Sequence, residues 1–170
     1  MPSAEQQPGF DSLLLENFNQ VLSYLGRLTG DLAVAHRLSE ETFDHVSRYY
    51  RKGRPPQQAR ALLFLVATGR ARDHLKKGDR RSIWQRFFSR PRGPLVEFTE
   101  EDAKGLGTDT SQRALSTLDF GDRVVLLLHD YCGLDYEEVA RAAGIGRTSV
   151  PRDLDRARHD FKQAYDYIRF

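Results

Sequence analysis

Residues 134–150 read Leu-Asp-Tyr-Glu-Glu-Val-Ala-Arg-Ala-Ala-Gly-Ile-Gly-Arg-Thr-Ser-Val, and this stretch decides the fold of the C-terminal part of the chain. Asp135 followed three residues later by Glu138 is the pattern of a capping box at the start of a helix. That helix ends after about two turns at Gly144, which tolerates the left-handed backbone of a tight turn. Ile145 then pins a second helix to the core. The pattern predicts a helix-turn-helix, which places its second helix in the major groove of DNA; the alternative is an ordinary helical hairpin inside a bundle.

Pro151 constrains where the second helix begins. An interior proline removes a backbone hydrogen bond at a cost of ~3 kcal/mol, but the first turn of a helix accommodates it. We therefore predict that Thr148 is the N-cap and that Pro151 lies in the first turn; the alternative is a kink. From Asp135 to the C-terminus seven acids balance seven Lys and Arg residues. DNA affinity here would depend on one basic face, formed by Arg147, Arg152, Arg156 and Arg158.

The N-terminal half also has the periodicity of helices. Apolar residues recur at steps of three and four between Phe10 and Leu28, which predicts a helix closed by Gly30. Asp31 then caps a second helix, which ends at Gly53. Two more helices follow, and their predicted ranges are 57–77, with Gly78 as its stop, and 81–89. Three aromatic residues of the last helix belong either to the core or to an exposed patch: Trp84, Phe87 and Phe88.

Residues 90–110 have the composition of a linker, because Pro and Gly alternate there with acids and small polar residues. Regular helix resumes near Ser111, and the stretch 121–131 is densely apolar, as the core of a second unit would be. No segment alternates like a β-strand. The predicted fold is all-α, with two small helical domains over residues 9–89 and 111–170 joined by a flexible linker.

Composition limits the function classes. The net charge of +2 argues little by itself, but nine Lys or Arg residues and only two acids lie between Arg70 and Arg92; this stripe could fit phosphate or could be a solvated helix face. The lone Cys132 allows no intrachain disulfide, and its apolar surroundings predict a buried, inert thiol. The histidines lack metal-ligand spacing, and no glycine-rich phosphate loop follows a strand. We expect no enzyme, no cofactor and no metal. The absence of a signal pattern or long apolar run predicts a cytoplasmic protein without membrane insertion.

Several motifs resemble one protein family. Residues 114–158, from Ala-Leu-Ser-Thr-Leu through Leu-Asp-Tyr-Glu-Glu-Val-Ala to Arg-Ala-Arg, are similar to the C-terminal promoter-reading domain of extracytoplasmic-function sigma factors, of the sigma-seventy family. Tyr24-Leu-Gly-Arg-Leu-Thr-Gly-Asp31, Ser39-Glu-Glu-Thr-Phe43 and Ala71-Arg-Asp-His-Leu75 resemble, in order, the helices of the other conserved sigma domain. The resemblance implies that residues 9–89 are sigma domain two and residues 111–170 are sigma domain four.

The resemblance also implies partners and sites. An alternative sigma factor binds core RNA polymerase, directs initiation at promoter DNA, and is commonly held by an anti-sigma factor. The polymerase-binding residues would be Leu38, Glu40, Glu41 and Phe43. The residues facing the minus-ten element, where backbone attraction and base stacking hold single-stranded DNA, would be Arg70, Arg72, His74, Lys76 and Lys77. The residues at the minus-thirty-five element would be Arg147, Thr148, Ser149, Arg152 and Arg156.

Some positions depart from the family pattern. Arg37 stands where an acid commonly precedes Leu38, Gly69 replaces an Asn, and Pro151 replaces a basic residue. Arg37 and Pro151 favour an alternative function: a diverged sigma-like regulator that binds polymerase or an anti-sigma factor and recognises promoters weakly.

Overall fold

The computed structural model describes the backbone of residues 9–88 and 109–170, and the side chains of residues 9–77 and 110–170. Within these residues the secondary structure is helical, with no strand. The prediction of an all-α fold is confirmed. The expected linker lies largely outside the described residues, and the question of whether Trp84, Phe87 and Phe88 are core lies outside the described side chains.

Three long helices form an N-terminal bundle: α1 (Phe10–Thr29), α2 (Leu32–Arg51) and α3 (Ala59–Phe88). The predicted end of α1 and the predicted start of α2 are confirmed. Gly30 closes α1 in the left-handed conformation with φ of 73°, and the Asp31 carboxylate caps α2 by accepting from the Val34 N–H at 3.1 Å. Tyr24 of α1 is fully buried in the bundle, and its hydroxyl shares a 2.7 Å hydrogen bond with Thr68 of α3.

The predicted stop at Gly78 is wrong. α3 continues through this glycine as one helix of 30 residues, which merges the two predicted helices. A helical glycine costs about 1 kcal/mol relative to alanine, but it ends a helix only where the backbone turns left-handed. The next proline after Pro56 is Pro91, so no residue within α3 forbids helix.

Four helices form a C-terminal unit: α4 (Asp109–Thr117), α5 (Phe120–Leu126), α6 (Tyr136–Ala143) and α7 (Val150–Arg169). The predicted helix over 121–131 is present, but its last turn, Leu127–Tyr131, is a π-helix rather than an α-helix. The Cys132 N–H accordingly donates to the Leu127 carbonyl at 2.8 Å, five residues back. This wider turn, which the periodicity did not predict, ends at Gly133 with φ of 71°.

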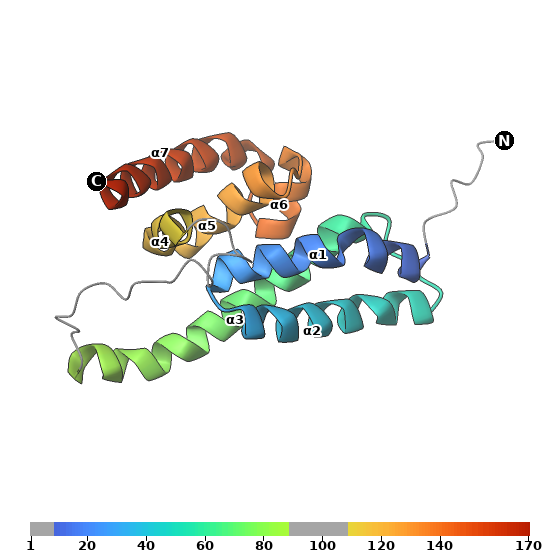
Figure 1. Cartoon of the computed structure of the whole chain (residues 1–170). Coiled ribbons are helices and arrows are strands. Elements are labelled where there is room, and N and C mark those ends of the chain that lie inside the picture. Colours follow the sequence, from blue (N-terminus) through green and yellow to red (C-terminus); the bar gives the residue numbers. More distant parts are fainter. Residues whose placement is uncertain (1–8, 89–108) are drawn as a thin grey trace.

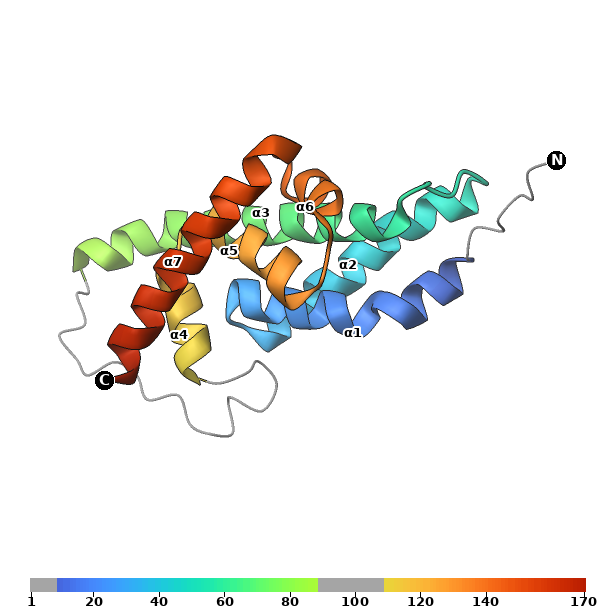
Figure 2. The same ribbon diagram turned by 90° about the horizontal axis from the view of Figure 1, so that it is seen from above.

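The C-terminal unit packs on α1 and α3, on the side of the bundle away from α2 (Figure 1). Seen from above, α7 crosses over α4 and α5 and is separated from the bundle by them (Figure 2). Buried apolar side chains of the two parts form one continuous cluster, which includes Tyr24 and Phe64 of the bundle and Leu128 and Leu134 of the C-terminal unit. In the described part of the chain no helix has the length and apolar character needed to cross a membrane.

Candidate nucleic-acid interface

The helix-turn-helix consists of α6, a tight turn and α7. The predicted capping box is complete: Asp135 accepts from the Glu138 N–H at 2.8 Å, and Glu138 accepts from the Asp135 N–H at 3.0 Å. Gly144 ends α6 with φ of 69°, and a Cβ added there would meet no atom within 4 Å. Glycine is therefore required at this turn for its backbone conformation rather than for space. Val139 and Val150 are fully buried between the two helices and the core.

The start of α7 differs from the prediction in one respect. Pro151 lies in the first turn, as expected, but Thr148 is not the N-cap. A single 3-10 turn, Arg147–Ser149, begins after Gly146 and leads directly into the helix at Val150. The 3-10 turn is compatible with the proline because Pro151 needs only a fixed φ and no N–H donor. It holds Arg147 and Thr148 exposed and Ser149 half-buried at the leading end of α7.

Most basic residues of α7 are engaged in ion pairs with acids of the same unit. Arg156 donates to the Asp122 carboxylate of α5 at 2.6 Å from Nη2 and at 3.2 and 3.3 Å from Nε. These bonds raise the pKa of Arg156. Arg158 binds Asp130 with both Nε and Nη2, and Arg152 donates to Asp153 at 3.3 Å. Among the basic residues between Arg147 and Arg158, all of which the structure describes, Arg147 is the one without an ion pair.

The basic stripe of α3 is partly occupied by other side chains. Arg70 donates to Glu41 of α2 at 3.2 Å, and the Arg72 guanidinium carbon lies 5.3 Å from the centre of the Phe120 ring of α5. Lys76 and Lys77 are exposed, and His74 is half-buried. The remaining cations of the predicted stripe, from Arg80 to Arg92, lie outside the described side chains.

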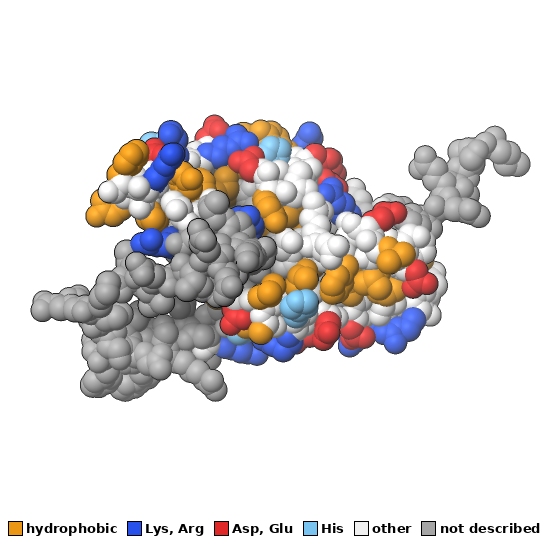
Figure 3. All heavy atoms as spheres, viewed as in Figure 1, with side chains coloured by type: hydrophobic (Ala, Val, Ile, Leu, Met, Phe, Trp, Pro, Cys, Tyr) orange, Lys and Arg blue, Asp and Glu red, His pale blue; other side chains and the backbone are white. Residues whose placement is uncertain are grey.

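Two of the four predicted polymerase-binding residues are core residues of the bundle. Leu38 and Phe43 of α2 are 2% and 4% exposed, so their side chains cannot contact a partner in this conformation. This corrects the prediction for these two, since the periodicity that makes α2 amphipathic also turns both side chains inward. Glu40 is exposed and Glu41 half-buried. Figure 3 shows a row of hydrophobic side chains along α2 with acidic and basic side chains beneath it, and Leu32 and Tyr49 of α2 are 46% and 40% exposed.

Arg37, one of the residues that depart from the family pattern, is paired with side chains of the bundle. It donates to Glu41 at 3.0 Å and, from Nη2, to Nδ1 of His74 at 3.2 Å. Because Glu41 also accepts from Arg70, this carboxylate links the predicted polymerase-binding helix to the predicted minus-ten helix.

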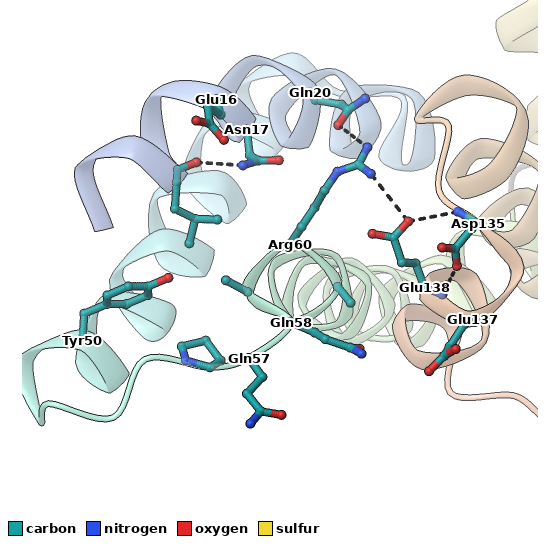
Figure 4. A pocket seen from close by; sticks show the side chains of 14 residues that line it. Glu16, Asn17, Gln20, Tyr50, Gln57, Gln58, Arg60, Asp135, Glu137 and Glu138 are labelled. Atoms are coloured by element: carbon teal, nitrogen blue, oxygen red, sulfur yellow. Dashed lines mark hydrogen bonds and ion pairs between the residues drawn. The ribbon is translucent and has the colours of Figure 1, made fainter. Parts of the chain in front are cut away.

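Two residues between the two parts of the molecule, Gln20 and Arg60, were not predicted from the sequence. The Cys132 carbonyl, at the end of the π-turn, accepts from Arg60 of α3 and from Gln20 of α1, both at 2.9 Å. Arg60 also donates to Gln20 at 3.1 Å and lies 3.6 Å from Glu138. A cleft of about 650 Å³ opens beside these groups, between α1, the start of α3 and α6 (Figure 4). The sequence feature that could have indicated this contact is Arg60, a charged residue directly before the apolar run Ala61–Ala67.

Burial of Cys132 itself is confirmed. The residue is 3% exposed, and burial raises the pKa of the thiol to about 12 against the opposing effect of Arg60 and Arg27. Both arginines belong to the bundle, so the thiol lies where the two parts of the molecule meet.

Comparison with known proteins agrees with this geometry. Residues 111–160 match the family described as sigma-70, region 4, and this range contains α6, the turn and the first half of α7. No curated protein sequence matches the chain. The solved structure of the sigma factor RpoE from Bartonella quintana, in complex with the anti-sigma factor NepR, is similar with a TM-score of 0.72 and 16% identity, over 92% of this chain and 96% of that one. Residues 111–160 thus match the sigma-70 region 4 family, and the chain as a whole has the fold of the Bartonella quintana sigma factor RpoE.

Proposed function

We propose that the protein is an alternative sigma factor that binds core RNA polymerase and directs promoter-specific initiation of transcription. The observation that carries the proposal is the overlap between the region 4 match and the helix-turn-helix, whose second helix has Arg147 and Thr148 exposed at its leading end. In this assignment the bundle is sigma domain two, residues 90–110 are the linker and the C-terminal unit is sigma domain four.

The leading end of α7 reads the minus-thirty-five element in this proposal. Residues at the start of a recognition helix reach base edges in the major groove, and arginine can contact both guanine and phosphate. Arg147 is the strongest candidate because it has no competing carboxylate. Arg152 is 76% exposed beside Asp153, so water screens that pair and phosphate can compete for its guanidinium.

The α3 stripe holds the minus-ten strand in this proposal, and α2 docks on polymerase through its exposed side. Lys76 and Lys77 supply backbone attraction to the single strand. On α2, Glu40 and the exposed apolar residues form the contact surface, while Leu38 and Phe43 shape the helix from within. Since RpoE of Bartonella quintana was solved with NepR, we also propose an anti-sigma factor as a partner of this chain.

Reconstituted transcription tests the proposal. The chain would be added to core RNA polymerase with fragmented genomic DNA, and transcript start sites would be mapped. The expected result is a set of discrete start sites preceded by a shared pair of sequence elements. The Arg147→Ala variant is expected to lose most of these transcripts and to retain polymerase binding. Lys162→Ala, which removes an exposed ion pair with Asp166 in the second half of α7, serves as the control.

A second function is favoured by the charge pattern of α7. Arg152, Arg156 and Arg158 are all paired with acids of the same unit, which lowers the attraction of this helix for phosphate. Such a helix suits a regulator that engages polymerase or an anti-sigma factor and recognises promoters weakly. Polymerase binding without promoter-specific transcripts would establish this function in place of the first.

A further inference from the structure

Asn17 of α1 is a buried amide with its oxygen unused. The residue is 6% exposed, and its Nδ2 donates to the Leu13 carbonyl at 2.9 Å. A carbonyl can only accept, so this bond fixes the amide with Oδ1 on the opposite side. No described residue donates to that oxygen. Buried acceptors are nearly always paired, so an unpaired one marks a place where a donor from another molecule can bind.

The Asn17 side chain faces a cleft. It lines the space of about 650 Å³ between α1, the start of α3 and α6, and Figure 4 shows it pointing from α1 into this space. The Tyr50 hydroxyl of α2 points into the same cleft and hydrogen-bonds to none of the described residues. Leu13, Pro56 and Ala59 form an apolar wall beside them. A few polar groups on an apolar wall are typical of a small-molecule site.

The charge around the cleft favours a cation. Carboxylates line it on two sides, with Glu16 on α1 and three acids at the start of α6: Asp135, Glu137 and Glu138. These three outweigh the positive end of the α6 dipole, which is equivalent to about half a charge. Among the lining residues, all of which the structure describes, Arg60 is the one cation, and it lies 3.6 Å from Glu138. Glu16 is exposed and has no ion pair with a described residue.

The carboxylates are not arranged as metal ligands. Within the described residues, no group of three or more acids, histidines or cysteines is placed to hold a metal ion. The acids lie instead on opposite sides of the cleft, on α1 and on α6 (Figure 4). A linear oligoamine fits such a spacing, because its ammonium groups are separated by methylene chains that can cover the apolar wall. Each ammonium group also has donors and no acceptor, which suits a carboxylate and an unpaired amide oxygen.

We propose that this cleft is a binding site for a linear oligoamine, with one ammonium group donating to Asn17 Oδ1 and to the Tyr50 hydroxyl beside Glu16, and another lying among the acids of α6. The inference goes beyond the proposed function and does not depend on it, since none of these residues belongs to the proposed DNA or polymerase contacts. Binding to the folded state stabilises the protein in proportion to the occupancy of the site.

Calorimetric titration of the full-length protein with spermidine, at low salt, tests the proposal. The expected result is saturable binding at one site, with a dissociation constant of about 1 mM or lower for a ligand of this size. At about ten times that concentration the Tm should rise by about 3–5 °C. Magnesium chloride at equal total charge is the control for general attraction to acidic surface, and it should give no saturable binding.

The two asparagines of the chain locate the bound amine. Asn17 and Asn19 are its only asparagines, and Asn19 is exposed and does not line the cleft. In protein labelled with nitrogen-15 at the asparagine side chains, spermidine should shift the Asn17 amide resonances along the same saturation curve as the calorimetry. The Asn19 resonances should stay in place.

Asn17→Leu removes the unpaired acceptor and keeps an apolar side chain of similar size. It should weaken spermidine binding about tenfold, as expected for a hydrogen bond from a charged donor. Thr42→Val is the matched control, because Thr42 is also buried and donates to a carbonyl four residues back, Leu38, at 2.7 Å. This control should bind spermidine as the unmodified protein does.

Two variants at less buried positions keep the test valid if Asn17→Leu does not fold. Tyr50→Phe removes only the hydroxyl, and Glu16→Gln removes only the charge; each should weaken binding roughly twofold to fivefold, as is typical of partly exposed polar contacts. Asp11→Asn is the matched control for Glu16→Gln, since Asp11 is exposed on α1 and does not line the cleft.

The proposal is overturned if spermidine does not saturate, if magnesium shifts the Asn17 resonances as spermidine does, or if the cleft variants that fold bind spermidine as tightly as their controls. Nα-acetyl-lysine amide has a single ammonium group and should bind at least tenfold more weakly than spermidine. Equal affinity for the two would overturn the oligoamine assignment and indicate a site for a lysine side chain of a protein partner.

Discussion

Arg156 was expected to contact DNA, but its geometry gives it a structural role. The substitution Arg156→Ala separates a role in DNA binding from a role in stability. The Asp122 side chain is only 8% exposed, and Arg156 supplies its hydrogen bonds from both Nε and Nη2. Removing the arginine would leave a largely buried carboxylate without its cation.

The magnitude follows from burial. Breaking a fully buried ion pair by removing one partner costs about 3–5 kcal/mol. Here the Arg156 side chain is 52% exposed, so water can replace the guanidinium, and we expect a loss of about 2 kcal/mol in the free energy of unfolding. For a chain of this length that lowers the Tm by about 4–8 °C. Arg152→Ala removes a cation that is 76% exposed and should lower the Tm by less than about 2 °C.

The assay pairs thermal unfolding with DNA binding below the transition. Arg156→Ala should lose stability and keep its DNA affinity, whereas Arg152→Ala should keep stability, bind DNA more weakly and reduce the salt slope by about one. Asp122→Asn completes a double-mutant cycle, in which coupling between positions 122 and 156 should account for most of the loss. The reasoning is refuted if Arg156→Ala leaves the Tm unchanged and weakens DNA binding as much as Arg152→Ala does.

Three further predictions concern stability. Gly69 lies inside α3, and a Cβ added there would meet no atom within 4 Å. Gly69→Ala should therefore raise the free energy of unfolding, measured by urea titration, by up to about 1 kcal/mol. A lower free energy of unfolding would instead show that the glycine has a packing role. Gly144→Ala should instead lower it by about 1 kcal/mol, because φ of 69° strains alanine, and equal stability of the two proteins would contradict the left-handed turn. Above about pH 9 the Cys132 thiol loses its proton in the unfolded state, while burial holds its pKa in the folded state at about 12. The free energy of unfolding should therefore fall with rising pH, by up to about 1.4 kcal/mol per pH unit. Cys132→Ala should flatten this slope, and an unchanged slope would assign it to another group, such as buried Tyr24, whose pKa is also raised.

The helical fold could be predicted from local chemistry. Asp31, Gly30, Asp135 and Gly144 each act through hydrogen bonds or backbone conformations within four residues along the chain, and the structure places all of them at the predicted helix ends. The prediction was wrong at Gly78 because a glycine is compatible with both a stop and a helix interior, and only longer-range context decides between them.

The arrangement of the candidate site was harder to predict, because it depends on which charges meet across helices. The partners Arg156 and Asp122 are 34 residues apart, and Arg60 and Cys132 are 72 apart. No periodicity within one helix indicates such pairs. Counting the charges on α7 therefore identified its basic residues but not their ion pairs. The family motif names Leu38 and Phe43 without giving the faces of α2 on which they lie.

The π-turn at Leu127–Tyr131 has a consequence for the history of the chain. One such turn holds one residue more than an α-helical turn, so it is what a single-residue insertion into a helix produces. The wider turn leaves the Cys132 carbonyl facing the bundle, where Arg60 and Gln20 donate to it. Relatives that are one residue shorter between Val124 and Gly133 should therefore have a regular α-helix there and an intact helix-turn-helix. They should not need Arg and Gln at the positions of Arg60 and Gln20.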